Sequence, residues 1–198
     1  MKILFISDFD NTLGDTYWPY WEGNIFRTKT LKDIAKATEI YEKYRRGPDD
    51  IVMYPSLLEA YAIKDPYKFF KKAGMDKQLF DDVVDALERL QHDDHVTTVI
   101  LTTGDEEFQK LKTDVTWVDA LVEEVYVTRD RNKIAHIHTL HEKYKPDMTV
   151  FLDDRIHMTS DDFDFPIMIL DMDRKWEKEG ENVVHGMTSV LDYLKAFE

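Results

Sequence analysis

The stretch ILFISDFDNTL (residues 3–13) decides the fold of this chain. Its first residues form a short apolar run without polar alternation, which is typical of a strand buried on both faces of a parallel sheet. Asp8 and Asp10 follow at once, and in an extended chain their side chains point to the same side. Because ligands of open parallel sheets bind beyond the carboxyl ends of the strands, both carboxylates are candidate functional residues.

Four further segments share this buried-strand pattern, at residues 97–101, 125–128, 149–152 and 167–170. Segments with helical spacing of apolar residues separate them, such as residues 80–90 and 134–144. Alternation of strands and helices predicts an α/β fold, a doubly wound parallel sheet with right-handed crossovers.

Residues 15–78 depart from this alternation, since they contain helical patterns at 31–41, 57–63 and 67–73 and no convincing strand. We therefore expect an α/β core from residues 1–14 and 79–198, with a small helical domain inserted at 15–78. Gly14 and Gly74 are the candidate joints, and Gly74 is a candidate helix C-cap. The insertion has 12 basic and 10 acidic residues, whereas the whole chain has a formal charge of −14.

Composition excludes several kinds of protein. Among 198 residues there is no cysteine, which rules out disulfides, thiolate metal sites and a cysteine nucleophile. The charge of −14 argues against nucleic acid or an anionic membrane as a partner. The apolar run at the start is too short for a signal peptide, and no segment reaches membrane-spanning length. We expect a soluble protein of the cytoplasm; its oligomeric state stays open.

Polar residues also follow two other predicted strands. Thr102 and Thr103 come after the strand at 97–101, and Asp153 and Asp154 after the strand at 149–152. Several carboxylates around one point repel each other and need a positive partner. Oxygen ligands without His or Cys suit a hard divalent cation, of which Mg²⁺ with a substrate phosphate is the usual case. The pattern therefore indicates phosphoryl chemistry.

Three ordered motifs, SDFDNTL, VILTTGD and VFLDDR, each follow an apolar strand and together resemble the haloacid dehalogenase (HAD) superfamily. The family's DxDx[TV] motif is present from Asp8 to Thr12, its Ser/Thr motif at Thr102, and its acidic pair at Asp153 and Asp154. The resemblance covers nearly the whole chain, and the insertion lies where this family often carries a cap. It implies the Rossmann-like HAD core with a small α-helical cap domain.

The resemblance also implies a role for each motif residue. Asp8 would attack phosphorus, and Asp10 would protonate the leaving oxygen and later activate water. Thr102 would hold a phosphoryl oxygen. Family members that cleave carbon–halogen bonds differ at the position of Asp10. The implied Mg²⁺ ligands are Asp8, the carbonyl of Asp10, Asp153 and Asp154.

The family also requires a cation beside the nucleophile. We assign this role to Lys133, which opens the helix at 134–144. We further expect Thr12, Thr103 and Gly104 to contact substrate. The rival cations are Lys110, Lys112, Arg129 and Arg131.

The function implied is that of a Mg²⁺-dependent phosphatase, which hydrolyses a small phosphate monoester through an aspartyl-phosphate. A cap over the strand ends favours a small phosphorylated metabolite as the partner. One alternative is a phosphotransferase or mutase on the same scaffold. Alternatives of another class are a phosphorylation-dependent signalling module and a non-catalytic interaction protein on this fold.

Other patterns have simpler interpretations. We interpret three histidines as surface residues of a helix, and a second DxD motif at Asp171 and Asp173 as a solvated loop. Aromatic residues in the insertion either close over a substrate or pack the cap against the core, and basic residues there either attract a phosphorylated molecule or are merely solvated. The histidines are His136, His138 and His141; the aromatic residues are Tyr17, Trp18, Tyr20 and Trp21; and the basic residues are Arg27, Lys29, Arg45 and Arg46.

Overall fold

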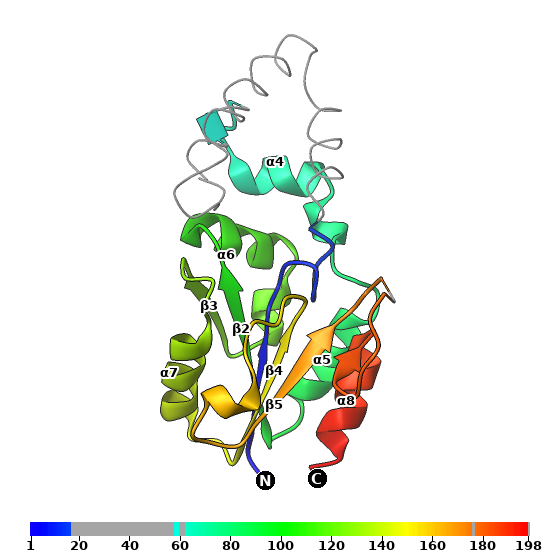
Figure 1. Cartoon of the computed structure of the whole chain (residues 1–198). Helices are drawn as coiled ribbons and strands as arrows, with labels where there is room; N and C mark the ends of the chain where they lie inside the picture. The colour runs from blue at the N-terminus through cyan, green and yellow to red at the C-terminus, as the bar shows by residue number, and fades with distance from the viewer. Residues whose placement is uncertain (17–57, 60–61, 176, 198) are drawn as a thin grey trace.

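The computed structural model describes residues 1–16, 58–59, 62–175 and 177–197. In this part of the chain, six strands form one fully parallel sheet in the order β3-β2-β1-β4-β5-β6 (Figure 1). The doubly wound α/β fold is thus confirmed. The strands are β1 (Ile3–Ser7), β2 (Val96–Thr103), β3 (Glu124–Thr128), β4 (Met148–Asp153), β5 (Ile167–Met172) and β6 (Val183–Val184).

Strand β1 lies at the centre of the sheet, between β2 and β4. Its last residue, Ser7, is in register with Ile100 on one side and Leu152 on the other. All five residues of β1 are buried, because helices cover both faces of the sheet. This explains why the strand is almost wholly apolar, and it places Asp8 between the ends of its two neighbours.

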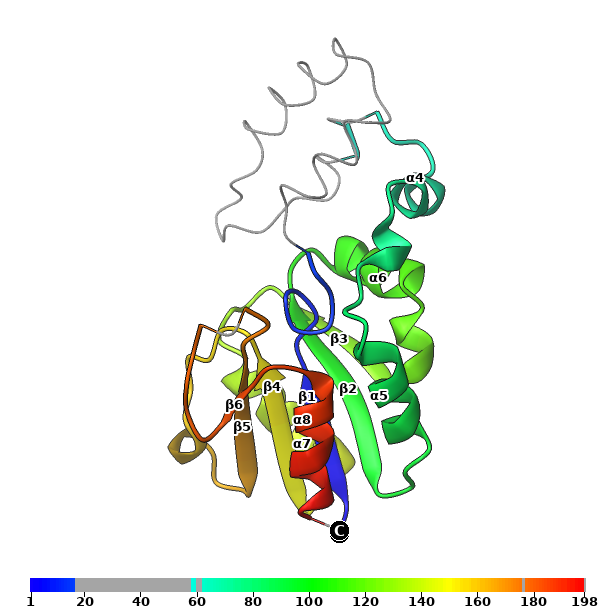
Figure 2. The ribbon, with the colours of Figure 1, turned by 90° about the vertical axis from the view of Figure 1, so that its right-hand side faces the viewer.

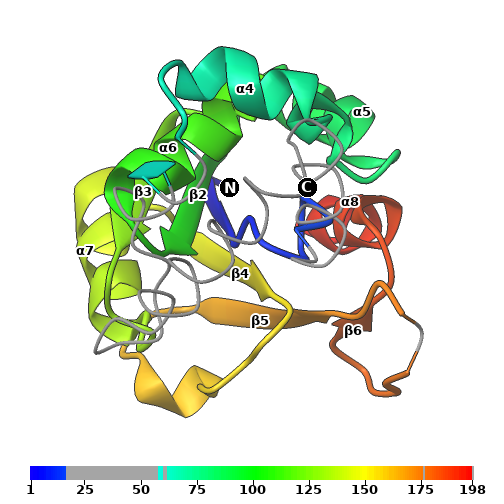
Figure 3. The same ribbon diagram turned by 90° about the horizontal axis from the view of Figure 1, so that it is seen from above.

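Helices α5 (Val83–Gln91) and α8 (Met187–Lys195) cover one face of the sheet, and α7 (Ile134–Tyr144) covers the other (Figures 2 and 3). Alternate side chains of β1 divide between two cores. Phe5 packs in the core with α5 and α8, whereas Ile6 packs in the core with α7. Burial of these apolar faces is the main stabilising contribution.

Two further helices lie at the end of the sheet where the strands terminate. α6 (Glu106–Val115) is capped at its N-terminus by Asp105, whose side chain accepts the backbone N–H of Phe108. α4 (Pro66–Lys72) packs on α6 through the rings of Phe70 and Phe108, whose centroids are 5.7 Å apart. Short 3₁₀ helices occur at η1 (Met75–Lys77), η2 (Val118–Leu121) and η3 (Ser160–Asp162).

The segments on either side of the predicted insertion lie next to each other. Gly14 forms an antiparallel bridge with Leu79, and the backbone N–H of Phe80 donates to the carbonyl of Leu13 at 3.0 Å. Gly74 follows α4 in the left-handed region at φ 89°, which confirms it as a helix-terminating residue. The two termini lie at the opposite end of the sheet from these joints (Figure 1).

The five predicted strands are confirmed. β6 was missed because it is only two residues long, and α8 was not predicted either. Residues 17–57 and 60–61 lie outside the described residues, and with them the predicted aromatic and basic residues of the insertion. The division into core and cap at residues 15–78 stays a prediction. No helix in the described part of the chain is long and apolar enough to cross a membrane.

Candidate active site

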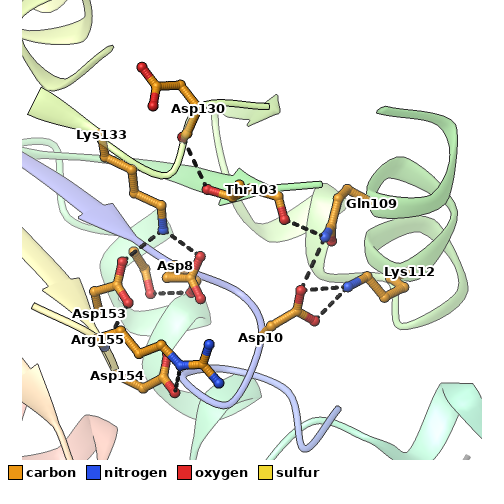
Figure 4. Close-up of polar contacts among 11 residues, drawn as sticks. Asp8, Asp10, Thr103, Gln109, Lys112, Asp130, Lys133, Asp153, Asp154 and Arg155 are labelled. Atoms are coloured by element: carbon orange, nitrogen blue, oxygen red, sulfur yellow. Dashed lines mark hydrogen bonds and ion pairs between the residues drawn. The ribbon is translucent and has the colours of Figure 1, made fainter. Parts of the chain in front are cut away.

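The carboxylates that follow β1 and those that end and follow β4 meet at one edge of the sheet (Figure 4). Carboxylate oxygens of Asp8, Asp153 and Asp154 all lie within 4.8 Å of one another. Asp8 and Asp153 are buried. Parallel pairing of β1 with β4 brings these residues together although they are far apart in sequence.

Lys133 joins two of these carboxylates. Its Nζ donates to Asp8 Oδ1 at 2.6 Å and to Asp153 Oδ2 at 2.8 Å. The three side chains are only 6 to 9% exposed, so the pairs are shielded from solvent. Lys133 is the residue that immediately precedes α7, as the sequence predicts. This contact supports its assignment as the cation beside Asp8.

The cluster contains more negative than positive charge. Burial raises the pKa of Asp8 to about 7: Lys133 counteracts this rise, and the neighbouring Asp153 and Asp10 add to it. The pKa of Lys133 is raised as well, because its two ion pairs outweigh the effect of its burial. Three carboxylates and one ammonium carry two net negative charges when all are ionised.

Asp154 shows the same excess of negative charge. Burial, followed by the adjacent Asp153, raises the pKa of Asp154 to about 6. Arg155 Nε lies 3.7 Å from Asp154 Oδ2, but the Arg155 side chain is largely exposed and compensates the charge weakly. Oxygen ligands and two uncompensated negative charges fit a hard divalent cation such as Mg²⁺. Asp8, Asp153 and Asp154 are the side chains that would hold it.

Asp10 belongs to a second, separate ion pair. Lys112 Nζ lies 2.5 Å from Asp10 Oδ1 and 2.6 Å from Asp10 Oδ2. Gln109 Nε2 also donates to Asp10 Oδ2, at 3.1 Å. Although burial acts in the opposite direction, Lys112 and then Gln109 lower the pKa of Asp10. Figure 4 shows its carboxylate directed towards α6, away from Asp8.

From the sequence, Lys112 was only a rival to Lys133, and Gln109 was not predicted to be a site residue. Both side chains are buried on the face of α6 that also carries Phe108. A Gln and a Lys at a spacing of three on an otherwise buried helix face were the signal that could have identified them.

The other rival cations lie elsewhere. Lys110 pairs with Glu106 on the exposed side of α6, at 2.6 Å. Arg129 is exposed and its Nη2 lies 3.8 Å from Asp105 Oδ2. Arg131 is exposed.

The predicted substrate-binding residues lie at the ends of β1 and β2. Thr102 is fully buried, and its Oγ1 has no hydrogen-bond partner among the described residues. Thr12 is also fully buried, and its Oγ1 likewise has no hydrogen-bond partner among the described residues. Unpaired buried hydroxyls are costly and are consistent with a ligand that accepts or donates there. Thr103 Oγ1 donates to the Asp130 carbonyl at 3.4 Å, and the Gly104 N–H donates to the Thr128 carbonyl at 2.8 Å.

The loop after β1 is held by an arginine that the sequence did not reveal. Arg174 donates to the Thr12 carbonyl from Nε at 3.2 Å and from Nη2 at 3.0 Å. Its Nη1 contacts both oxygens of Asp82, at 2.7 and 2.9 Å. Asp82 Oδ2 in turn accepts the N–H of Met187 at the start of α8. These bonds join the loop after β1, the segment at Asp82 just before α5, and the start of α8.

The second DxD motif is not the solvated loop that the sequence suggested. Asp171 lies within β5, one residue before the strand ends at Met172, and its carboxylate pairs with Lys178 at 2.6 Å. Asp173 is buried and accepts the backbone N–H groups of Lys175 and Lys178, at 3.1 and 2.6 Å. The strand is longer than predicted, and Asp173 stabilises the turn after it.

The three histidines of α7 are half-buried, which corrects their interpretation as surface residues. Ring nitrogens of His136 and His141 contact the hydroxyls of Thr128 and Thr149, at 2.8 and 2.9 Å. The rings of His138 and His141 contact Phe163 and Phe165. Packing against the loop between β4 and β5 accounts for His138 and His141, and packing against Tyr126 and Thr128 of β3 accounts for His136.

No protein family model matches the chain, and no curated protein matches it in sequence. Solved structures do match in fold. A protein from Burkholderia xenovorans described as a haloacid dehalogenase-like hydrolase has a TM-score of 0.68 and 18% identity, with 99% of this chain and 98% of that chain covered. A HAD phosphatase from Thermococcus onnurineus has a TM-score of 0.64, 13% identity and 98% coverage of both chains. L-2-haloacid dehalogenase from Xanthobacter autotrophicus has a TM-score of 0.61, 10% identity and 99% coverage of both chains. The chain therefore has the HAD-like α/β fold.

Proposed function

We propose that this protein is a Mg²⁺-dependent phosphatase that hydrolyses a small phosphate monoester through an aspartyl-phosphate. The observation that carries the proposal is the separation of the carboxylates into two groups. Asp8 shares Lys133 with Asp153 in a cluster suited to a divalent cation. Asp10 lies outside that cluster on its own lysine.

Asp8 is the proposed nucleophile. Its carboxylate oxygen attacks phosphorus, a P–O bond to Asp8 forms, and the bond between phosphorus and the ester oxygen breaks. Lys133, at 2.6 Å, orients Asp8 and compensates part of the charge of the incoming phosphate. A divalent cation bound by Asp8, Asp153 and Asp154 would supply further electrostatic stabilisation of the phosphoryl oxygens.

Asp10 is the proposed acid and base. In its protonated form it gives a proton to the departing ester oxygen, and as a carboxylate it takes a proton from the water that hydrolyses the aspartyl-phosphate. Thr102 is the proposed donor to a phosphoryl oxygen, and its unpartnered buried hydroxyl supports this role. Thr12, Thr103 and Gly104 stay predicted substrate contacts.

Asp10 also favours phosphate ester hydrolysis over carbon–halogen cleavage. Both phosphatases and dehalogenases share this fold. A dehalogenation that proceeds through an ester of Asp8 expels halide, which needs no proton. When an alkoxide leaves, it needs a proton, and Asp10, held by Lys112 and Gln109 two positions after the nucleophile, can donate one.

The test is a screen of phosphomonoesters with Mg²⁺, in which inorganic phosphate is measured. We expect activity that EDTA abolishes and that Asp8→Asn reduces at least about a thousandfold. Asp192→Asn, at an exposed carboxylate of α8 that pairs with Lys195, is the matched control and should retain activity. Activity that survives both EDTA and Asp8→Asn would refute the proposal.

A further inference from the structure

Lys112 is an unusual residue to find inside the protein. Its side chain is 5% exposed, and its Nζ lies 5.6 Å from the ring centroid of Phe9 and 5.2 Å from that of Phe108. Burying an ammonium group is costly unless it is paired. Its carboxylate partner among the described residues is Asp10, and both oxygens of that partner accept from it.

Gln109, one helical turn before Lys112, fixes this arrangement to the end of β2. Its Nε2 donates to Asp10 Oδ2 at 3.1 Å and to the Thr103 carbonyl at 2.9 Å. A Cβ at Gly104 would lie 2.3 Å from the same nitrogen, so the glycine leaves room for this side chain. The direction of the Asp10 carboxylate is therefore determined by α6 and β2.

We propose that Lys112 and Gln109 are positioning residues that keep the Asp10 carboxylate out of the metal cluster, and so available for proton transfer. The inference rests on the proposed phosphatase function and deepens it. The two lysines have distinct tasks: Lys133 draws Asp8 and Asp153 together, and Lys112 holds Asp10 apart from them.

Electrostatics explains why Asp10 needs to be held away from the metal cluster. Asp10 lies two residues from Asp8, close to a cluster whose excess negative charge attracts a divalent cation. That cation would also attract the carboxylate of Asp10, and a carboxylate that coordinates a metal cannot donate a proton. The fixed charge of Lys112, at 2.5 Å, opposes this movement.

A direct role of Lys112 in binding substrate is less compatible with the structure. Its side chain is almost inaccessible, whereas that of Asp10 is 30% exposed. A ligand can therefore approach Asp10 from solvent without displacing Lys112.

The leaving group provides a test. Asp10, whose side chain is 30% exposed, first takes up a proton from solvent. In the first step the P–O bond to Asp8 then forms, the bond to the ester oxygen breaks, and the proton passes from Asp10 to that oxygen. An alkoxide needs this proton, whereas 4-nitrophenolate is stable enough to leave without it. Because kcat/KM includes only steps up to the first irreversible one, it reports this half of the reaction.

We would compare Lys112→Met with wild type on an alkyl phosphate and on 4-nitrophenyl phosphate. We expect kcat/KM to fall at least about tenfold for the alkyl ester and to change less than about threefold for the nitrophenyl ester. Lys110→Met, on the exposed side of the same helix, should change neither. An equal loss on both esters, or no loss on the alkyl ester, would overturn the positioning role.

A double-mutant cycle with Asp10→Asn separates positioning from an independent role. Lys112→Met should add little to the loss that Asp10→Asn already causes, and additive losses would refute the proposal. If Lys112→Met does not fold, Gln109→Met leaves the ion pair in place and should show the same ester dependence. Wild-type protein without Mg²⁺-dependent activity would instead refute the proposed function itself.

Discussion

Replacement of Lys133 by Met removes the charge that holds Asp8 and Asp153 together. The two ion pairs, at 2.6 and 2.8 Å, have a Coulomb energy of about 6 kcal/mol each at an effective dielectric constant of about 20. Desolvation of the three groups offsets most of this attraction. Loss of one partner from a buried ion pair typically costs about 3–5 kcal/mol, because the remaining charges stay buried.

For a chain of 198 residues, 1 kcal/mol corresponds to about 2–4 °C in Tm. We therefore expect Lys133→Met to lower Tm by about 6–20 °C in EDTA at about pH 8, where Asp8 is mostly ionised. Mg²⁺ should raise the Tm of the variant more than that of wild type, because the cluster then has three uncompensated carboxylates.

Differential scanning fluorimetry with Mg²⁺ or EDTA measures both effects. Lys110→Met is the matched control, since its solvent-exposed pair with Glu106 should contribute little to stability. A Tm for Lys133→Met within about 2 °C of wild type in EDTA would refute the reasoning. So would an equal Mg²⁺ response in the two proteins.

Three further predictions concern the stability of the protein. Burial raises the pKa of Asp8 to about 7, above its unfolded value of 3.8, so the stability of the metal-free protein should fall as pH rises from about 4 to 7. The Tm gain from Mg²⁺ should increase over the same pH range, and a Tm gain that does not depend on pH would contradict this. Arg174→Met removes the donor to the Thr12 carbonyl and the ion-pair partner of Asp82, which retains the N–H of Met187. We expect a cost of about 2–4 kcal/mol in urea unfolding, and a change below about 0.5 kcal/mol would count against this. Gly104→Ala places a Cβ 2.3 Å from Gln109 Nε2, so it should cost about 1–3 kcal/mol and reduce kcat/KM for an alkyl phosphate; unchanged stability and activity would contradict that clash.

Much of the fold follows from local patterns. Apolar runs without alternation predicted five of the six strands, because buried parallel strands have no solvent-facing side. β6 was missed since two residues provide no periodicity. The DxD motif after residue 170 was misinterpreted because composition alone does not show that Asp173 is buried and accepts backbone N–H groups.

The sequence by itself determined that the carboxylates after β1 and at the end of β4 lie at one edge of the sheet. Asp8, Asp153 and Asp154 follow or end strands of one parallel sheet, and the carboxyl ends of such strands share an edge. Only the tertiary structure decided which lysine serves which carboxylate. Lys112 belongs to α6 and Lys133 precedes α7, and the placement of both helices depends on tertiary packing. The partner of each lysine depends on that placement rather than on spacing along the chain. For that reason the separation of Asp10 from the acidic cluster became visible only in three dimensions.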